Sequence, residues 1–397
     1  MSGEGGAAGS RELAPDALTS PNWRTAAEPS RDGELSSDAG GFPTPLTEGR
    51  IIEDGQDRHT GEQSTERART AIPRIGSLLA GALVLASCSG VQSALDPAGE
   101  EAAQVAALFW VMAFGGGVIW AAVVALALYA ARWKRTSISE AAGARLIFWG
   151  GAVFPITVLT ALLAFALWLM PSLRPFAGHD GELRQIEVVG SQFWWRVAYV
   201  RQDGARVVSA NEIRLPVGER VEFVLETTDM IHSFWIPALG GKMDLVPGRT
   251  NRLSLRATRT GTYRGQCAEF CGTSHAQMAF PVVVMAVEEF EAWLDARSMA
   301  SSGIDADPKG RDVFGAEGCG ACHRIDGTDA AGTAGPDLSH VGSRLTLGAG
   351  LLANESNAME RFIAHSSSVK PGSHMPAYLD LSADDLSRVA GWLEGLK

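Results

Sequence analysis

The chain has 397 residues, a formal net charge of −11 and five cysteines. This length suggests two or more domains with separate cores. Residues 1–70 carry 7 Arg and 13 Asp or Glu, a net charge of −6, so over half of the negative charge belongs to one segment. The acidity therefore indicates a tail and not a cationic substrate, and nothing in the sequence resembles a nucleic-acid-binding surface.

The first 70 residues are rich in Gly, Ala, Ser, Pro, Thr and Glu and have almost no aromatic residues. Such a segment cannot bury enough apolar surface to offset its ordering entropy. We therefore expect residues 1–70 to be a disordered, low-complexity tail.

Residues 71–88 have the layout of a secretory signal. Arg67, Arg69 and Arg74 precede an apolar run at 75–86, and small residues follow at its end. The final Leu-Ala-Ser-Cys resembles a bacterial lipoprotein box, which implies that Cys88 is the lipidated first residue of the mature chain. A signal helix with an incidental cysteine is the alternative. The long region before the signal is either a misassigned start or a cytoplasmic extension, and the sequence does not decide between them.

Residues 103–171 are predicted to form a transmembrane helix hairpin. The stretches 104–131 and 146–170 are almost entirely apolar and long enough to cross a bilayer. Four basic residues lie between the two stretches, which places the connection in the cytoplasm and both ends of the hairpin on the outer face. Pro155 lies inside the second span, where neighbouring helices can satisfy the carbonyl that it frees. The basic residues are Arg132, Lys134, Arg135 and Arg145.

Residues 180–297 change to short β-rich runs separated by turn signals such as Asp203-Gly204 and Pro247-Gly248. This spacing predicts an all-β sandwich or barrel. A short helix at 287–296 is expected to close the domain. The predicted strands are 185–189, 194–199, 212–215, 221–226, 250–255 and 281–287.

Residues 267–278 concentrate groups that bind soft metals: two thiols, an imidazole, a thioether and a carboxylate. Thiolate, thioether and imidazole together favour copper or another soft metal over magnesium or calcium. A zinc site would more naturally show Cys-x-x-Cys pairs and no methionine. Two cysteines four residues apart on a tight loop can bridge a pair of metals, and His232 is available as a second histidine. The alternative is a surface disulfide with an unrelated histidine. The groups belong to Cys267, Glu269, Cys271, His275 and Met278.

At these residues the chain closely resembles subunit 2 of haem–copper cytochrome c oxidases, and the resemblance runs from about residue 103 to 297. It implies a cupredoxin fold with a dinuclear copper centre, Cu(A), bridged by Cys267 and Cys271. His232, on one loop of the sandwich, and His275, on a second loop at the same end, would each supply an imidazole to one copper. Met278 and the backbone carbonyl of Glu269 would be weak axial ligands.

The resemblance also implies that the Glu269 side chain helps to hold magnesium at the interface with oxidase subunit 1. Quinol oxidase relatives lack the cysteines, so their presence indicates a cytochrome c branch. The family's aromatic patch is matched at 190–195, where a donor's electron commonly enters through a tryptophan. Phe193 occupies that position, so its role is left open, and Trp194 and Trp195 can equally be core or interface residues.

A small, polar stretch at 298–308 is expected to be a flexible linker. Residues 309–397 follow, and their Cys319-Gly-Ala-Cys322-His323 is the attachment pattern for c-type haem. Two thiols three apart meet the two vinyl groups, and the adjacent histidine becomes an iron ligand. A redox-active Cys-x-x-Cys is the alternative.

This segment resembles class I cytochrome c, which implies an all-α domain. Gly335-Pro336-Asp337-Leu338 matches the loop whose proline carbonyl orients the ligand histidine. Met375 is expected to be the sixth iron ligand. Met359 is the other methionine of the domain, in a setting typical of an ordinary helix, and His374 is expected to face solvent.

The predicted architecture is therefore multidomain: a two-helix transmembrane hairpin, an all-β cupredoxin domain and an all-α cytochrome c domain. The five cysteines divide into one lipid anchor, two copper bridges and two haem thioethers. The predicted function is electron entry into a bacterial cytochrome c oxidase, with both redox domains on the outer face of the cell membrane. Its partners would be subunit 1, other oxidase subunits, membrane lipid and a respiratory donor, either cytochrome c or a quinol:cytochrome c reductase. No oxygen-binding residues are recognised, so oxygen reduction and proton pumping would belong to the complex. The alternatives are electron entry into a copper-dependent nitric oxide reductase and a membrane-tethered electron carrier.

Overall fold

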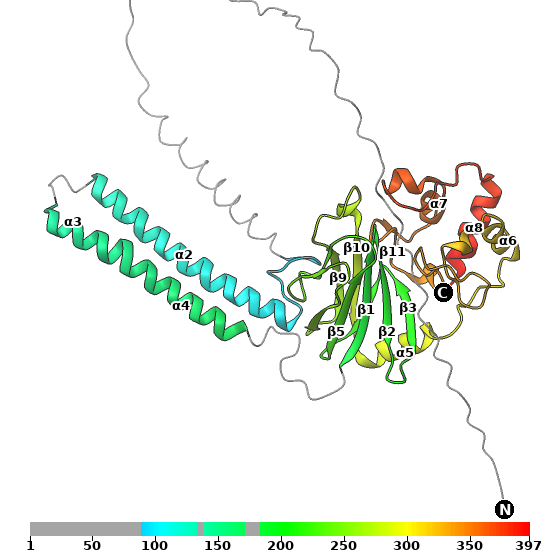
Figure 1. Cartoon of the computed structure of the whole chain (residues 1–397), viewed down its shortest axis with the longest axis horizontal. Helices are drawn as coiled ribbons and strands as arrows, with labels where there is room; N and C mark the ends of the chain where they lie inside the picture. Colours follow the sequence, from blue (N-terminus) through cyan, green and yellow to red (C-terminus); the bar gives the residue numbers. More distant parts are fainter. Residues whose placement is uncertain (1–88, 133–137, 171–182) are drawn as a thin grey trace, which may run out of the picture. The chain divides into compact units, whose positions relative to one another are not determined.

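A computed structural model describes residues 89–132, 138–170 and 183–397, and Figure 1 shows their helices and strands along the chain. The predicted tail at 1–70 and the predicted signal at 71–88, with Cys88, lie outside the described residues. Those two predictions therefore stay predictions.

Both expected membrane spans are helical. Among the described residues, Glu100–Arg132 and Glu140–Leu169 are helices long and apolar enough to cross a membrane, with mean hydropathies of 2.2 and 2.3 over an 18-residue window of each. Pro155 lies in the first turn of α4, directly after a π-helical segment, where a proline without an N–H is tolerated. The elements are α2 (Glu100–Arg132), α3 (Glu140–Leu146), the π-helical η2 (Ile147–Val153) and α4 (Phe154–Leu169).

The first turn of α2 is built into the all-β domain. Gly99 forms a bridge with Ala257, and a Cβ at residue 99 would lie 2.2 Å from the carbonyl oxygen of Leu239, so only glycine fits there. Glu101 is 5% exposed and accepts hydrogen bonds from the Arg220 guanidinium and from the backbone N–H of Arg256. The Arg220 contact pairs a buried carboxylate with a cation that is only partly exposed, as burial of charge requires.

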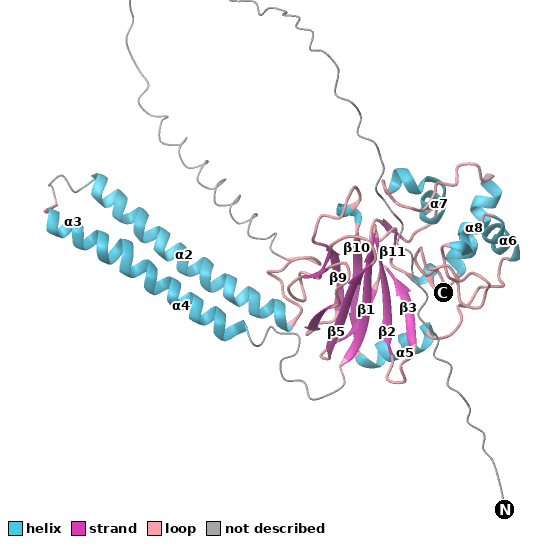
Figure 2. Cartoon of the chain, in the orientation of Figure 1, coloured by secondary structure: helices cyan, strands magenta, loops and turns pink. Residues whose placement is uncertain are grey.

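The all-β region is a sandwich of two five-stranded sheets, seen as the magenta strands in Figure 2. One sheet has the order β3-β2-β1-β5-β8, and the other has the order β4-β10-β9-β6-β7. The first sheet contains β1 (Arg184–Ser191), β2 (Trp194–Val200), β3 (Arg206–Ala210), β5 (Arg220–Thr227) and β8 (Asn251–Arg256). The second contains β4 (Ile213–Pro216), β6 (His232–Trp235), β7 (Met243–Leu245), β9 (Gly261–Cys267) and β10 (Ala279–Met285).

The core of the sandwich is aromatic. Phe234 stacks on Phe280 with ring centroids 5.0 Å apart, and Trp195 meets both rings edge-on. All three side chains are at most 1% exposed. Burial of such large rings is a main stabilising contribution of a core of this size. Trp195 is thus a core residue.

The predicted strand set was incomplete. Strands β3, β6, β7 and β9 were not expected. The strands β6 and β7 are only four and three residues long, and β9 contains two glycines, Gly261 and Gly265. Short or glycine-containing strands carry little alternating pattern, so pairing with neighbours decides them. The closing helix α5 spans Val287–Arg297, as expected within one residue.

The C-terminal segment is mainly helical and has its own core. It contains α6 (Pro308–Ala316), the 3₁₀ turns η5 (Cys319–Ala321) and η6 (Val341–Ser343), a short β11–β12 pair (Thr346–Leu347 and Leu352–Ala353), α7 (Ala358–Val369) and α8 (Ala383–Gly395). Phe314 and Trp392 pack with their rings 5.3 Å apart and join α6 to α8. The expected all-α domain is therefore borne out apart from one two-stranded ribbon.

The predicted flexible linker at 298–308 is ordered in its middle. Ser302 and Lys397 exchange backbone hydrogen bonds of 2.9 and 3.3 Å, and the Trp392 indole N–H donates to the carbonyl of Ile304 at 2.9 Å. A polar composition predicted flexibility, but these backbone groups find partners at the end of α8. The linker therefore joins the C-terminal domain over part of its length.

Candidate redox centres

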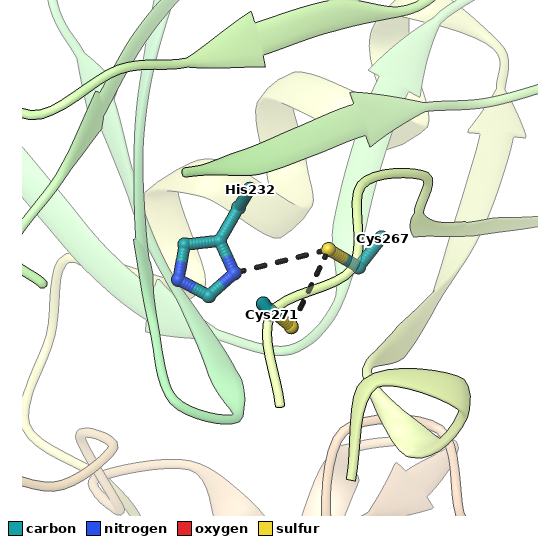
Figure 3. Close-up of side chains that lie close together, drawn as sticks. All are labelled: His232, Cys267 and Cys271. Atoms are coloured by element: carbon teal, nitrogen blue, oxygen red, sulfur yellow. Dashed lines mark hydrogen bonds between the residues drawn. The ribbon is translucent and has the colours of Figure 1, made fainter. Parts of the chain in front are cut away.

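Strand pairing brings the first two candidate copper ligands together. Phe234 in β6 pairs with Cys267 in β9, and the β6 strand begins at His232. His232 was expected on a loop, and the structure corrects this: it is paired with Leu245 of β7. Figure 3 shows His232, Cys267 and Cys271 pointing toward one another. Their donor atoms all lie within 4.8 Å of one another, and all three residues are buried.

The remaining expected ligands surround the same point. The Cys267 and Cys271 sulfurs are 3.8 Å apart, and the Cys271 sulfur lies 3.6 Å from Nδ1 of His275 and 3.9 Å from the Met278 sulfur. The carbonyl oxygen of Glu269 lies 3.3 Å from the Cys267 sulfur. Six donors from one strand end, one loop and the start of β6 thus converge within one small volume.

Asp229 is a candidate positioning residue that the sequence reasoning missed. Its Oδ1 lies 2.8 Å from Nε2 of His232, while Nδ1 of the same ring lies 3.8 Å from the Cys267 sulfur. A carboxylate on one ring nitrogen fixes the ring and leaves the other nitrogen for a metal. The signal was present in the sequence: an Asp three residues before the histidine.

Electrostatics at the two cysteines favour metal binding. The nearby Cys271 sulfur holds the pKa of Cys267 well below its usual range, against the effect of burial, and the His232 ring acts in the same direction. The same contact with Cys267 raises the pKa of Cys271, and burial adds to that rise. Cys267 is therefore the more acidic of the two thiols, and a soft metal would displace the protons of both. A pair of thiolates with imidazole, thioether and carbonyl donors fits a dinuclear copper centre.

The Glu269 side chain lies at the surface beside Lys242. Its carboxylate is 46% exposed and lies 3.5 Å from Nζ of Lys242. The backbone carbonyl of Glu269 thus lies near the Cys267 sulfur, while its carboxylate lies at the surface. Phe270, the next residue, is 77% exposed.

A cavity of about 690 Å³ is lined mainly by the C-terminal domain. Its walls carry every group that c-type haem needs, and a volume of this size is typical of a cofactor pocket. The expected haem residues among its lining are Cys319, Cys322, His323 and Met375. Residues of the sandwich line part of the same cavity: Ser191, Gln192, Phe193, Trp194, Arg196, Asn211, Thr228 and Asp229.

The expected proximal histidine is held as the sequence predicted. Nδ1 of His323 lies 2.7 Å from the carbonyl oxygen of Pro336, which leaves Nε2 free to ligate iron. A Cβ at Gly335 would lie 2.6 Å from the His323 ring, so the loop approaches the ring closely. Burial lowers the pKa of His323, which keeps the ring neutral as a metal ligand requires. The residues present therefore fit c-type haem.

The structure brings all three candidates for the sixth position to the cavity. Met359, His374 and Met375 all line it, so lining alone does not choose among them. Met359 is 5% exposed and lies in α7, where it belongs to the hydrophobic core. His374 is exposed, as expected.

The aromatic patch divides into separate roles. The Phe193 ring is 4% exposed. It lies between Gly272, on the loop after Cys271, and Gly372, on the loop before Met375. A Cβ at Gly272 would be 3.2 Å from that ring, and a Cβ at Gly372 would be 3.3 Å from it. The Arg196 guanidinium lies over the Trp194 ring, with its Cζ 5.6 Å from the ring centroid.

Comparison with known proteins agrees with two redox domains, the sandwich and the C-terminal domain. The family model for the periplasmic domain of cytochrome c oxidase subunit II matches residues 197–287, and the cytochrome c model matches residues 308–397. Cytochrome c oxidase subunit 2 of Alkalihalophilus pseudofirmus is 39% identical over 214 residues, which are 53% of this chain and 61% of that protein.

Subunit 2 of Bacillus subtilis is 31% identical over 264 residues, 62% of this chain and 73% of that protein. Among solved structures, the periplasmic domain of subunit II of the Bradyrhizobium japonicum cytochrome oxidase is 32% identical, with a TM-score of 0.27. The match covers 30% of this chain and 97% of the solved domain. The chain spans a little under two thirds of the length of the Alkalihalophilus relative and nearly three quarters of the Bacillus one.

Proposed function

The chain belongs to the cytochrome c oxidase subunit 2 family, and on that premise we propose that it is the electron-entry subunit of a respiratory cytochrome c oxidase. One observation carries the proposal: six candidate metal donors, two of them thiols, converge in the sandwich, and the same chain holds a Cys-x-x-Cys-His cavity fit for haem. Bound copper and haem would each supply reversible one-electron redox chemistry, while the protein sets their position, burial and potential.

In this proposal the ligand roles follow the resemblance residue by residue. Cys267 and Cys271 would hold two coppers between them, and His232 and His275 would each bind one. Met278 and the Glu269 carbonyl would be the weaker axial donors, and the Glu269 carboxylate would contribute to a magnesium site at subunit 1. The convergence of these groups around the two sulfurs supports the assignment.

For the haem, Cys319 and Cys322 would form the thioethers, His323 would bind iron and Met375 would be the sixth ligand. A donor, either cytochrome c or a quinol:cytochrome c reductase, delivers electrons to this domain. Subunit 1 receives them, reduces oxygen and pumps protons. The apolar helices α2 and α4 hold the chain in the cell membrane, with both redox domains on the outer face.

The test uses the native complex that contains this chain. Two equivalent coppers sharing one unpaired electron give a seven-line hyperfine pattern in electron paramagnetic resonance, and the complex should show it while consuming oxygen. Cys271→Ser should abolish the pattern and slow oxygen uptake at least about tenfold, because a bridging ligand is lost. Ala276→Ser, at an exposed position of the same loop, is the matched control and should change neither.

Other results would decide against the proposal. Uptake of nitric oxide without oxygen would indicate a nitric oxide reductase. Both cofactors with no gas consumption and no subunit 1 would indicate a tethered electron carrier. A zinc-loaded site without the seven-line pattern would exclude the copper assignment.

A further inference from the structure

Lys370 is a buried lysine whose partners are carbonyl groups. It follows α7 directly and is 3% exposed, which is rare for a lysine. Its Nζ donates to the carbonyl oxygen of Gln277, at 3.0 Å, and to that of Gly348. Burial lowers the pKa of Lys370 to about 7, yet the amine donates to carbonyls in either protonation state, so the contact does not depend on its charge.

The Gln277 carbonyl belongs to the copper-ligand loop, residues 272–278. Gln277 stands between His275 and Met278, two of the proposed copper ligands, in the 3₁₀ turn η4 (His275–Gln277). A second hydrogen bond joins the same two segments, because the Ser274 hydroxyl donates to the carbonyl of Pro371, the residue after Lys370. Ser274 is 1% exposed, so this contact is also shielded from water.

The same lysine is tied to the proposed sixth haem ligand. The backbone N–H of Lys370 donates to the carbonyl of Ser366 at 2.8 Å, and the Ser366 hydroxyl donates to the carbonyl of Met375 at 2.9 Å. Ser366 is fully buried and so holds both ends of the loop from 370 to 375. Neither bond involves the lysine amine, so the loop that carries Met375 keeps this anchor when the amine is removed.

A third contact reinforces this arrangement. The backbone N–H of Ala279, at the start of β10, donates to the carbonyl of Ala349 at 3.0 Å. Ala349 follows Gly348, the second acceptor of the lysine amine. Lys370 thus lies where the copper-ligand loop, the haem-ligand loop (370–376) and the turn at 348–350 meet.

We propose that Lys370 is a positioning residue that fixes the haem-ligand loop (370–376) against the copper-ligand loop (272–278) and thereby sets the rate of electron transfer between the two centres. The inference rests on the proposed function. The transfer moves one electron from the reduced haem to the oxidised copper pair, and no bond forms or breaks. Lys370 takes no part in the transfer itself, but its hydrogen bonds keep the docked arrangement populated.

The experiment compares Lys370→Met with wild type in the native complex. Flash-induced injection of an electron into the haem, followed by copper reduction, gives the transfer rate. We expect the rate to fall about tenfold in Lys370→Met, because the loss of two buried hydrogen bonds depopulates the docked state. The haem absorption, the haem potential and the copper resonance spectrum should remain those of wild type. Lys309→Met, at an exposed lysine of α6, is the matched control and should leave the rate unchanged.

A second variant guards against misfolding of the first. Ser274→Ala removes the neighbouring hydrogen bond without emptying the lysine site, and it should lower the rate about threefold. Unchanged rates in both variants, with both centres loaded, would overturn the inference. An altered copper spectrum in Lys370→Met would also overturn it, because the lysine would then merely support the copper site. If wild type itself shows no dicopper spectrum or no transfer, the proposed function fails instead.

Discussion

Asp229 illustrates how a single side chain prepares the copper site. It receives hydrogen bonds from the backbone N–H groups of Gln192, at 2.7 Å, and Met230, at 2.6 Å, besides its contact with His232. Burial opposes ionisation, but the His232 bond and these N–H groups keep the pKa of Asp229 below its ordinary value. The ionised carboxylate can therefore hold the His232 ring with Nδ1 toward the sulfurs.

Asp229→Asn should weaken copper binding about tenfold, because an amide holds the His232 ring less firmly than a carboxylate does. Competition with a copper chelator at fixed pH measures the affinity, and the copper resonance spectrum should broaden or shift. Asp203→Asn, in an exposed turn of the same domain, is the control. Equal copper affinity in Asp229→Asn and wild type would show that the carboxylate does not orient the ring.

His340 is a buried histidine outside both redox centres. It is 8% exposed, and burial lowers its pKa, with Arg297 acting in the same direction. The unfolded chain therefore binds more protons than the folded chain once the pH falls below about 6.5, the ordinary value for histidine. Stability is then lost as the pH decreases through that range.

We expect the C-terminal domain to lose stability between pH 7.5 and pH 5.5, and His340→Gln to reduce that loss because glutamine does not titrate. Thermal melting of the purified chain, followed by haem absorption at both pH values, measures the difference. His365→Gln, at an exposed position, should behave like wild type. An equal acid effect in His340→Gln and wild type would contradict the prediction.

At the scale of elements, the two methionines of the C-terminal domain lie in different kinds of structure. Met359 is in the first turn of α7 and packs in the core, whereas Met375 is on the loop between α7 and α8. A helix in a packed core fixes its side chains for burial. A loop anchored at both ends can present a side chain to a cofactor, which is why loops on rigid frames commonly carry ligands.

Met375→Ala should therefore lower the haem potential and remove the absorption typical of methionine-ligated haem, since methionine ligation raises the potential. Met359→Ala should keep both properties but destabilise the domain by about 2–5 kcal/mol, as large-to-small core substitutions do. Redox titration and thermal melting distinguish the two variants. Loss of the methionine signature in Met359→Ala alone would reverse the assignment.

On the scale of the whole molecule, the sandwich and the C-terminal domain belong to one chain and share direct hydrogen bonds between their ligand loops. Their encounter is therefore intramolecular, at an effective concentration of roughly millimolar for a short tether. Tethering reduces the need for charge-steered docking, which salt screens. Phe193, packed between the two loops, is compatible with such a fixed contact.

Electron transfer from haem to copper should accordingly be independent of protein concentration and vary little with ionic strength. Flash-induced injection across a dilution series of the purified chain, at low and high salt, tests both points. A rate proportional to concentration would mean that each haem serves the copper centre of another molecule. A rate that collapses with added salt would mean that docking depends on surface charge.

The sequence alone predicted those features that depend on local pattern. The Cys-x-Glu-x-Cys-x-x-x-His-x-x-Met and Cys-x-x-Cys-His spacings each place several ligand groups on one short segment, so the spacing is enough to predict the two kinds of redox site. Long apolar runs likewise predicted the two membrane helices, because a bilayer demands continuous hydrophobic length.

The tertiary structure decided what depends on pairing between distant residues. His232 was expected on a loop, but β6 places it beside Cys267 through pairing with β9. Nothing local in Lys370 or in the polar stretch at 298–308 reveals partners that lie 93 residues away, at Gln277, or at the C-terminus. Burial and hydrogen-bond partners arise only when separate segments pack, so a local sequence pattern cannot show them.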